Sequence, residues 1–132
     1  MASIHREIEV AAATGPVWDA VRDVGRIHER LVPGFVTDCT LDGDTRVVTF
    51  GNGTTLRERI VDIDDLQRRV AWAVVGAPFT HHNASLQVCF EGPERTRLVW
   101  IADLLPDALE AQIAGLMEQG LAVMRQTLEA RA

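Results

Sequence analysis

The sequence predicts an α+β fold in which a curved, seven-stranded antiparallel sheet closes around one long C-terminal helix. Two patterns support this prediction. Between residues 107 and 129, apolar or small residues recur at steps of three and four, which is the spacing of one helix face. Between residues 35 and 104, alternating runs are separated by tight-turn sequences, as in strands joined by hairpins. One amphipathic helix can cover only one face of such a sheet, so the sheet is expected to curve around it.

The elements can be assigned in chain order. Residues 4–10 alternate apolar and polar side chains, as a half-buried strand does. Thr14 is a candidate N-cap and Pro16 suits the first turn of a short helix, which a second helical turn follows at residues 26–31. Pro106 suits the start of the long helix, in which Leu109, Ile113, Leu116, Gly120, Met124 and Leu128 form the predicted buried stripe. The other six strands are predicted at residues 35–41, 46–50, 55–63, 68–75, 82–90 and 97–104.

Length and composition narrow the class of protein. A chain of 132 residues without a linker or repeat is expected to form one domain, residues 1–132. The net charge of -6 argues against nucleic acid as a partner. The sequence has no apolar run long enough to span a membrane and no apolar signal core at its start, so we expect no membrane insertion and a cytoplasmic location. Cys39 and Cys89 are expected to be buried free thiols.

Several kinds of chemistry lack support. All 13 basic residues are arginines, so a lysine Schiff base is excluded. The chain contains no nucleotide-binding, nucleophile-elbow or zinc-protease motif, and we expect no cofactor. The adjacent His81 and His82 point to opposite faces of a strand, so they cannot readily bind one metal ion, and no metal site is predicted.

Strand alternation predicts which side chains face the interior, if each strand is turned so that its arginines point outward. This rule places Glu58 and His82 among apolar neighbours. A carboxylate in an apolar interior is costly unless it is hydrogen-bonded, paired or wet. Glu58 could therefore pair with an arginine or face a cavity, and His82 could be a satisfied core residue or a functional one. The other inward residues of these strands are Leu56, Ile60, Val70, Trp72, Val74, Ala84, Leu86, Val88, Phe90, Leu98, Trp100, Ala102 and Leu104.

A further group of residues is a candidate lining for an internal cavity. Trp72 and Trp100 lie on adjacent inner faces, where they serve either as core or as pocket walls. Gly115 and Gly120 interrupt the long helix, and glycine inside a helix usually has a packing or clearance reason. The candidate ligand-binding residues are Phe35, Phe50, Glu58, Trp72, His82, Trp100, Leu116, Met117, Gly120 and Met124.

The sequence resembles the SRPBCC superfamily, which contains START domains, pollen-allergen-like proteins and bacterial polyketide cyclase/dehydrase or lipid-transport proteins. The resemblance covers nearly the whole chain and implies a helix-grip fold with a hydrophobic cavity between sheet and helix. The matching residues are Pro16-Val17-Trp18, Asp23, Pro33, Gly53, Arg57-Glu58-Arg59-Ile60, Asp64, Arg68-Arg69, Trp72, Leu98-Val99-Trp100 and Pro106.

Three functions are compatible with these features. The first hypothesis is a protein, monomeric or homodimeric, that binds a small hydrophobic ligand such as a lipid, a polyketide or an aromatic metabolite. The second is a polyketide cyclase or dehydratase with Glu58 or His82 as acid/base, because proton transfer needs a group tuned inside a dry pocket. The third is a co-chaperone-like interaction module, which would instead expose an apolar patch. Whether the protein is an enzyme stays open at this point.

Overall fold

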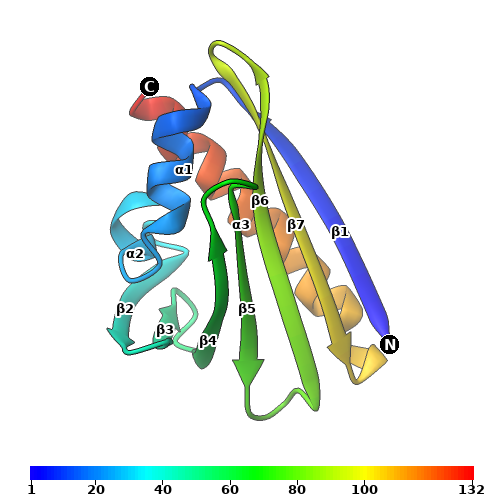
Figure 1. The fold of residues 1–132 in the computed structure, drawn as a ribbon. Coiled ribbons are helices and arrows are strands. Elements are labelled where there is room, and N and C mark those ends of the chain that lie inside the picture. The colour runs from blue at the N-terminus through cyan, green and yellow to red at the C-terminus, as the bar shows by residue number, and fades with distance from the viewer.

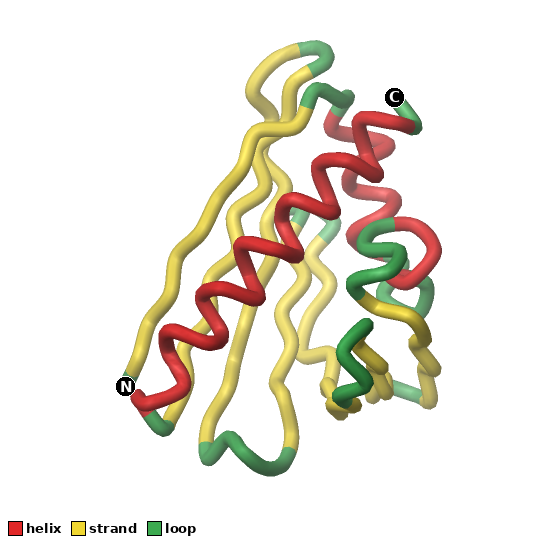
Figure 2. Tube along the Cα trace, turned by 180° about the vertical axis from the view of Figure 1, so that it is seen from behind, coloured by secondary structure: helices red, strands yellow, loops and turns green.

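The structure is a computed structural model that describes residues 1–132. Seven strands form one antiparallel sheet in the order β1-β7-β6-β5-β4-β3-β2, and a long helix crosses one face of it (Figures 1 and 2). The strands are β1 (Ala2–Val10), β2 (Val36–Asp42), β3 (Thr45–Phe50), β4 (Thr55–Asp64), β5 (Arg69–Val75), β6 (His81–Gly92) and β7 (Arg95–Leu105). The helical elements are α1 (Thr14–Arg22), α2 (Ile27–Arg30), the 3-10 turn η1 (Asp107–Leu109) and α3 (Glu110–Ala130).

The predicted fold class is therefore confirmed. Each predicted strand lies within one or two residues of an observed one, because turn residues mark nearly every strand end. Gly43, for example, adopts a φ of +63° between β2 and β3, a conformation that favours glycine. β1 pairs antiparallel with β7, so the first and last strands of the chain lie side by side, and α3 starts beside the N-terminal end of β1 (Figure 2).

The start of α1 differs from the prediction. Thr14 is the first helical residue, and Ala13 occupies the N-cap without a side-chain hydrogen bond. The hydroxyl of Thr14 lies instead 3.1 Å from the hydroxyl of Thr96, which donates to the carbonyl of Ala12 at 2.7 Å. Thr14 therefore fastens the start of α1 to β7 rather than capping its own helix.

The buried stripe of α3 is shifted from the predicted one. Gly120, Met124 and Leu128 are buried as expected, whereas Leu109, Ile113 and Leu116 are only half-buried. The difference arises because α3 packs mainly against β1, the edge strand, and less against β7. The residues that complete the buried stripe are Ala114, Met117 and Leu121.

Three other predictions of burial need correction. Phe90 is 65% exposed, and it lies beside an irregularity in the β6–β7 pairing between Phe90 and Gly92. Cys39 is a buried free thiol as expected, but Cys89 is only half-buried. Arg46 is 4% exposed and faces inward, against the rule that placed arginines outside.

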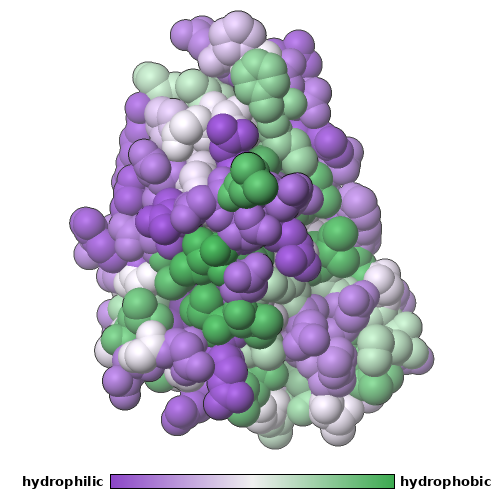
Figure 3. All heavy atoms as spheres, viewed as in Figure 1, coloured by the Kyte–Doolittle hydropathy of each residue, from purple (hydrophilic) through white to green (hydrophobic).

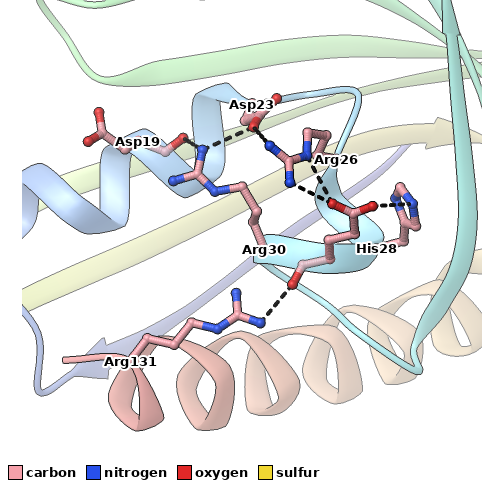
Figure 4. Close-up of polar contacts among 7 residues, drawn as sticks. Asp19, Asp23, Arg26, His28, Arg30 and Arg131 are labelled. Carbon is pink, nitrogen blue, oxygen red and sulfur yellow. Dashed lines mark hydrogen bonds and ion pairs between the residues drawn. The ribbon is translucent and has the colours of Figure 1, made fainter.

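The short helix α2 is held by polar contacts to neighbouring elements and within its own turn (Figure 4). Arg30 contacts the Asp23 carboxylate at 3.0 Å, and Arg26 contacts Glu29 at 2.8 Å. From the far end of the chain, Arg131 donates to the backbone carbonyl of Glu29 at 2.8 Å. These contacts link α2 to α1 and to the end of α3, so they hold in place a helix that covers one end of the interior.

Candidate functional site

Two small cavities lie between the inner face of the sheet and α3. The first, here called the α2 cavity, has a volume of about 70 Å³ and is bounded by Ile27 of α2 and Met124 of α3, among other residues. The second, here called the His82 cavity, has a volume of about 60 Å³ and is bounded by His82 of β6 and Leu116 of α3, among other residues. The two cavities share five walls, which are Phe35, Phe50, Glu58, Trp72 and Trp100. They are therefore neighbours within one interior.

A buried ion pair joins the walls of this interior. Arg46 of β3 and Glu58 of β4 are directly opposite each other in the antiparallel ladder and point to the same face. Arg46 reaches Glu58 Oε1 through Nε at 2.9 Å and through a terminal nitrogen at 2.8 Å. The two residues are only 4% and 6% exposed. The prediction that Glu58 faces the interior is thus correct, and of its open alternatives the arginine partner and the cavity both apply.

The rest of the Arg46 side chain is also engaged. Its other terminal nitrogen donates to the carbonyl of Val24 at 3.1 Å, and its guanidinium lies 5.3 Å from the ring centroid of Trp72. Arg46 is therefore fixed on three sides. Since both Arg46 contacts with Glu58 reach Oε1, the second carboxylate oxygen, Oε2, stays available to a ligand in the adjoining cavities.

His82 lies on the wall of the second cavity. It is 9% exposed, its ring centroid lies 4.5 Å from that of Phe79, and its Nδ1 atom has no hydrogen-bond partner. Burial, followed by the charge of neighbouring His81, lowers the pKa of His82 to about 4. At neutral pH the imidazole is therefore uncharged and can accept or donate one hydrogen bond without carrying charge into the interior.

Four aromatic rings stand where the two cavities meet. Trp72 and Trp100 lie with their ring centroids 6.1 Å apart and their planes tilted by 55°. Phe35 and Phe50 meet edge to face at 5.7 Å. The backbone segments that precede Phe35 and follow Phe50 approach each other closely. A Cβ atom at Gly51 would lie only 2.5 Å from the carbonyl oxygen of Gly34, so a larger residue would not fit there.

Gly120 differs from its predicted role as a cavity wall. A Cβ atom at this position would lie 2.9 Å from the Trp100 ring and 3.3 Å from the Phe35 ring, so Gly120 makes room for these aromatic side chains. At Gly115 an added Cβ would meet no atom within 4 Å. The remaining nine candidate ligand-binding residues, Phe35, Phe50, Glu58, Trp72, His82, Trp100, Leu116, Met117 and Met124, all line one or both cavities.

Sequence reasoning missed Arg46. The signal that could have found it is the short turn at residues 51–54, which sets the register of β3 against β4 and places Arg46 opposite Glu58. Reasoning from one strand at a time could not see this pairing. The walls from α1 and α2, such as Val21 and Ile27, were also missed, because short helices give weak periodic signals.

The outer face of the sheet is different in character. It carries a shallow hollow of about 550 Å³ whose lining includes Asp62, Arg69 and Asp103. On this side of the molecule, apolar surface is interrupted by hydrophilic residues (Figure 3). Exposed Val61 lies in the same hollow, at 61% exposure.

Two further findings concern ions and membranes. No group of three or more His, Cys, Asp and Glu side chains is placed so that it could hold a metal ion. None of the helices combines the length and the apolar character needed to cross a membrane.

Comparison with known proteins places this geometry in a family. Residues 1–129 match the family described as "Polyketide cyclase / dehydrase and lipid transport". The chain belongs to this family. The match confirms the resemblance to the SRPBCC superfamily, of which this family is part. Among curated proteins, none matches the sequence significantly.

Several solved structures match this chain over nearly its whole length. A solution NMR structure of a protein from Thermobifida fusca is 30% identical with a TM-score of 0.79, and the match covers 99% of this chain and 93% of that one. A START superfamily protein from Mycobacterium smegmatis is 14% identical with a TM-score of 0.71, over 98% and 95% of the two chains. Norcoclaurine synthase from Thalictrum flavum, in complex with dopamine and hydroxybenzaldehyde, is 19% identical with a TM-score of 0.71, over 98% and 84%. The last two likenesses concern the fold alone.

Proposed function

We propose that this member of the polyketide cyclase/dehydrase and lipid transport family binds a small, mainly apolar molecule between the sheet and α3, with Glu58 as its polar anchor. The observation that carries the proposal is the Arg46–Glu58 pair, which lies in the wall of both cavities with one carboxylate oxygen uncommitted. Ligand sites are mostly apolar and contain a few placed polar groups, and this interior has that composition.

The lining favours an aromatic ligand with a hydroxyl group. Trp72, Trp100, Phe35 and Phe50 offer ring faces and edges, and Glu58 offers an acceptor for an O–H donor. The norcoclaurine synthase complex supports this chemistry, because dopamine and hydroxybenzaldehyde are both hydroxylated aromatic molecules. We therefore infer a phenolic or polyketide-like ligand in preference to a simple hydrocarbon.

The size of the cavities limits what can bind without movement. Drug-sized ligands occupy pockets of roughly 300–1,000 Å³. The two cavities here measure about 70 and 60 Å³. A drug-sized ligand would therefore have to displace side chains or move α2, which is a helix of only four residues.

A thermal-shift and native mass-spectrometry screen tests the proposal. The panel comprises fatty acids, sterols and hydroxylated aromatics, and we expect the last group to raise the melting temperature. In the Val48→Phe variant, a larger side chain fills the α2 cavity, so affinity for the same compounds should fall at least tenfold. The matched control is Val61→Phe, the same substitution on the outer face, which should bind like the wild type. Failure of every compound to stabilise the wild type would overturn the proposal, as would equal binding by the two variants.

A second function has a specific observation in its favour. The family description includes cyclases and dehydrases, and the interior holds both Glu58 and a neutral imidazole at His82. We infer that, if a reaction occurs, one of these groups transfers the proton. The test needs an aromatic polyketide that the protein converts. If Glu58→Gln and His82→Ala convert it at the wild-type rate, neither residue transfers the proton.

The co-chaperone-like alternative has less support. It requires a continuous apolar patch on the surface, whereas the exposed large apolar residues come from different strands and turns; they are Met1, Leu41, Val61, Leu66, Val75 and Phe90. The same screen addresses it, because an interaction module would gain no stability from small apolar compounds.

A further inference from the structure

The two cavities are separated by the aromatic side chains at their junction, and of these Trp100 approaches Gly120 of α3 most closely. We propose that Trp100 is the specificity-determining residue of this interior. Its indole divides one elongated space into two small cavities, and a ligand of two or more rings binds by displacing it. This inference rests on the proposed function, because it concerns the ligand of the same interior.

The position of Trp100 follows from the lining of the cavities. Along α3, the His82 cavity contacts the helix at Leu116 and Met117, and the α2 cavity contacts it at Met124. Gly120 lies between these positions, and the atom nearest to its absent side chain is Cζ3 of Trp100. The indole therefore reaches α3 at the level where one cavity ends and the other begins.

Polar contacts do not fix this indole in place. The Nε1 atom of Trp100 is buried and has no hydrogen-bond partner, whereas a buried indole N–H usually finds one. Trp18 provides the contrast within the same chain, because its Nε1 donates to Asp65 at 3.0 Å. Rotation of Trp100 would break no hydrogen bond, and an acceptor on a ligand would give its N–H the partner that it lacks.

The volumes indicate what displacement would achieve. A cavity of about 150 Å³ accommodates one benzene ring. At about 70 and 60 Å³, each cavity is less than half that size. Neither space admits an aromatic ring while Trp100 remains in position. With the indole displaced, the two spaces and the volume between them form one slot suited to a flat, elongated molecule with a hydroxyl group.

The experiment compares a one-ring and a two-ring probe, phenol and 4-phenylphenol, in calorimetric titrations of the full chain. Trp100→Ala should bind 4-phenylphenol at least tenfold more tightly than the wild type does. The matched control is Leu86→Ala, which enlarges only the α2 cavity and should improve phenol binding without improving 4-phenylphenol binding. Trp100→Phe retains a ring at the junction and should give an intermediate gain. It also keeps the test valid if the alanine variant does not fold.

A second measurement follows the side chain directly in the wild type. The chain has three indole N–H groups, in Trp18, Trp72 and Trp100, and the variants Trp18→Phe and Trp100→Phe identify the NMR signals of Trp18 and Trp100. On addition of 4-phenylphenol, the Trp100 signal should shift and the Trp18 signal should not.

The outcomes separate this inference from the proposed function. If the wild type binds phenols but Trp100→Ala and Trp100→Phe gain no more for the two-ring probe than Leu86→Ala does, the role of Trp100 is wrong and the binding function stands. A Trp100 signal that does not move in the bound wild type leads to the same conclusion. If neither probe binds the wild type or any variant, both the inference and the proposed function are overturned.

Discussion

Removing Arg46 alone should cost more stability than removing both members of the Arg46–Glu58 pair. A buried charge left without its partner typically costs about 3–5 kcal/mol. Glu58→Leu should fall near the lower end, about 3 kcal/mol, because Arg46 keeps its contacts with the Val24 carbonyl and the Trp72 ring. Arg46→Met should fall near the upper end, about 5 kcal/mol, because it removes those contacts as well and leaves the carboxylate alone.

The double variant tests whether the pair acts as a unit. With both charges gone, the main remaining penalty is at the Val24 carbonyl, which loses its Arg46 donor and keeps only the weaker Cys39 thiol donor at 3.6 Å; the cost is about 1–3 kcal/mol. The double variant should therefore be more stable than Arg46→Met alone and comparable to Glu58→Leu. If the proposed function is right, it should also lose affinity for phenolic ligands despite that stability, because the anchor has gone.

Urea unfolding followed by circular dichroism measures these differences and avoids the fluorescence of nearby Trp72. The exposed pair Arg95–Glu9, whose side chains are 63% and 54% exposed, is the control. The same apolar replacements there should change stability little, since water screens that pair. If the losses of the two single interior variants simply add in the double variant, Arg46 and Glu58 act independently and the reasoning is refuted.

Two other predictions concern α3 and His82. Gly115→Ala should raise the free energy of unfolding by about 1 kcal/mol because its side chain meets open space, whereas Gly120→Ala should lower it by about 1–3 kcal/mol because its Cβ meets the Trp100 ring. Urea unfolding of both variants checks the pair, and equal effects would contradict it. Because the pKa of His82 is about 4 in the fold and near 6.5 when unfolded, stability should be full above pH 6.5 and fall by up to about 3 kcal/mol toward pH 4. Unfolding measured against pH should show this loss diminished in His82→Phe, and an unchanged pH profile would be evidence against it.

The sequence was sufficient to predict the architecture because turn-forming residues separate the strands and the long helix has a regular apolar spacing. Turn residues bound most of the strands, and the apolar spacing of residues 107–129 has one period throughout. Alternation also placed Glu58 and His82 correctly on the inner face. These features are local, so they can be read without knowing which segments meet.

Features that depend on two segments meeting could not be predicted in this way. The inward direction of Arg46 is fixed by the register of β3 against β4. The role of Gly120 depends on the length of Trp100, which reaches α3 from β7 on the opposite wall. Phe90 has the inward phase of its strand but lies beside an irregularity in the β6–β7 pairing, and it is exposed. In each case the position of the side chain depends on how two segments of the chain meet, which the pattern of one strand or helix does not reveal.

The polar atoms of the interior give the strongest reason to regard it as more than a core. In the chain, three buried side-chain polar atoms lack a hydrogen-bond partner, and two of them belong to His82 and Trp100, which line the cavities. Each such atom costs about 1–3 kcal/mol. The Arg46–Glu58 pair lies in the same walls, and a buried ion pair often adds little stability over apolar residues. A core selected for stability alone would not gather these groups around one space, whereas a ligand with a hydroxyl group and an acceptor would satisfy them together.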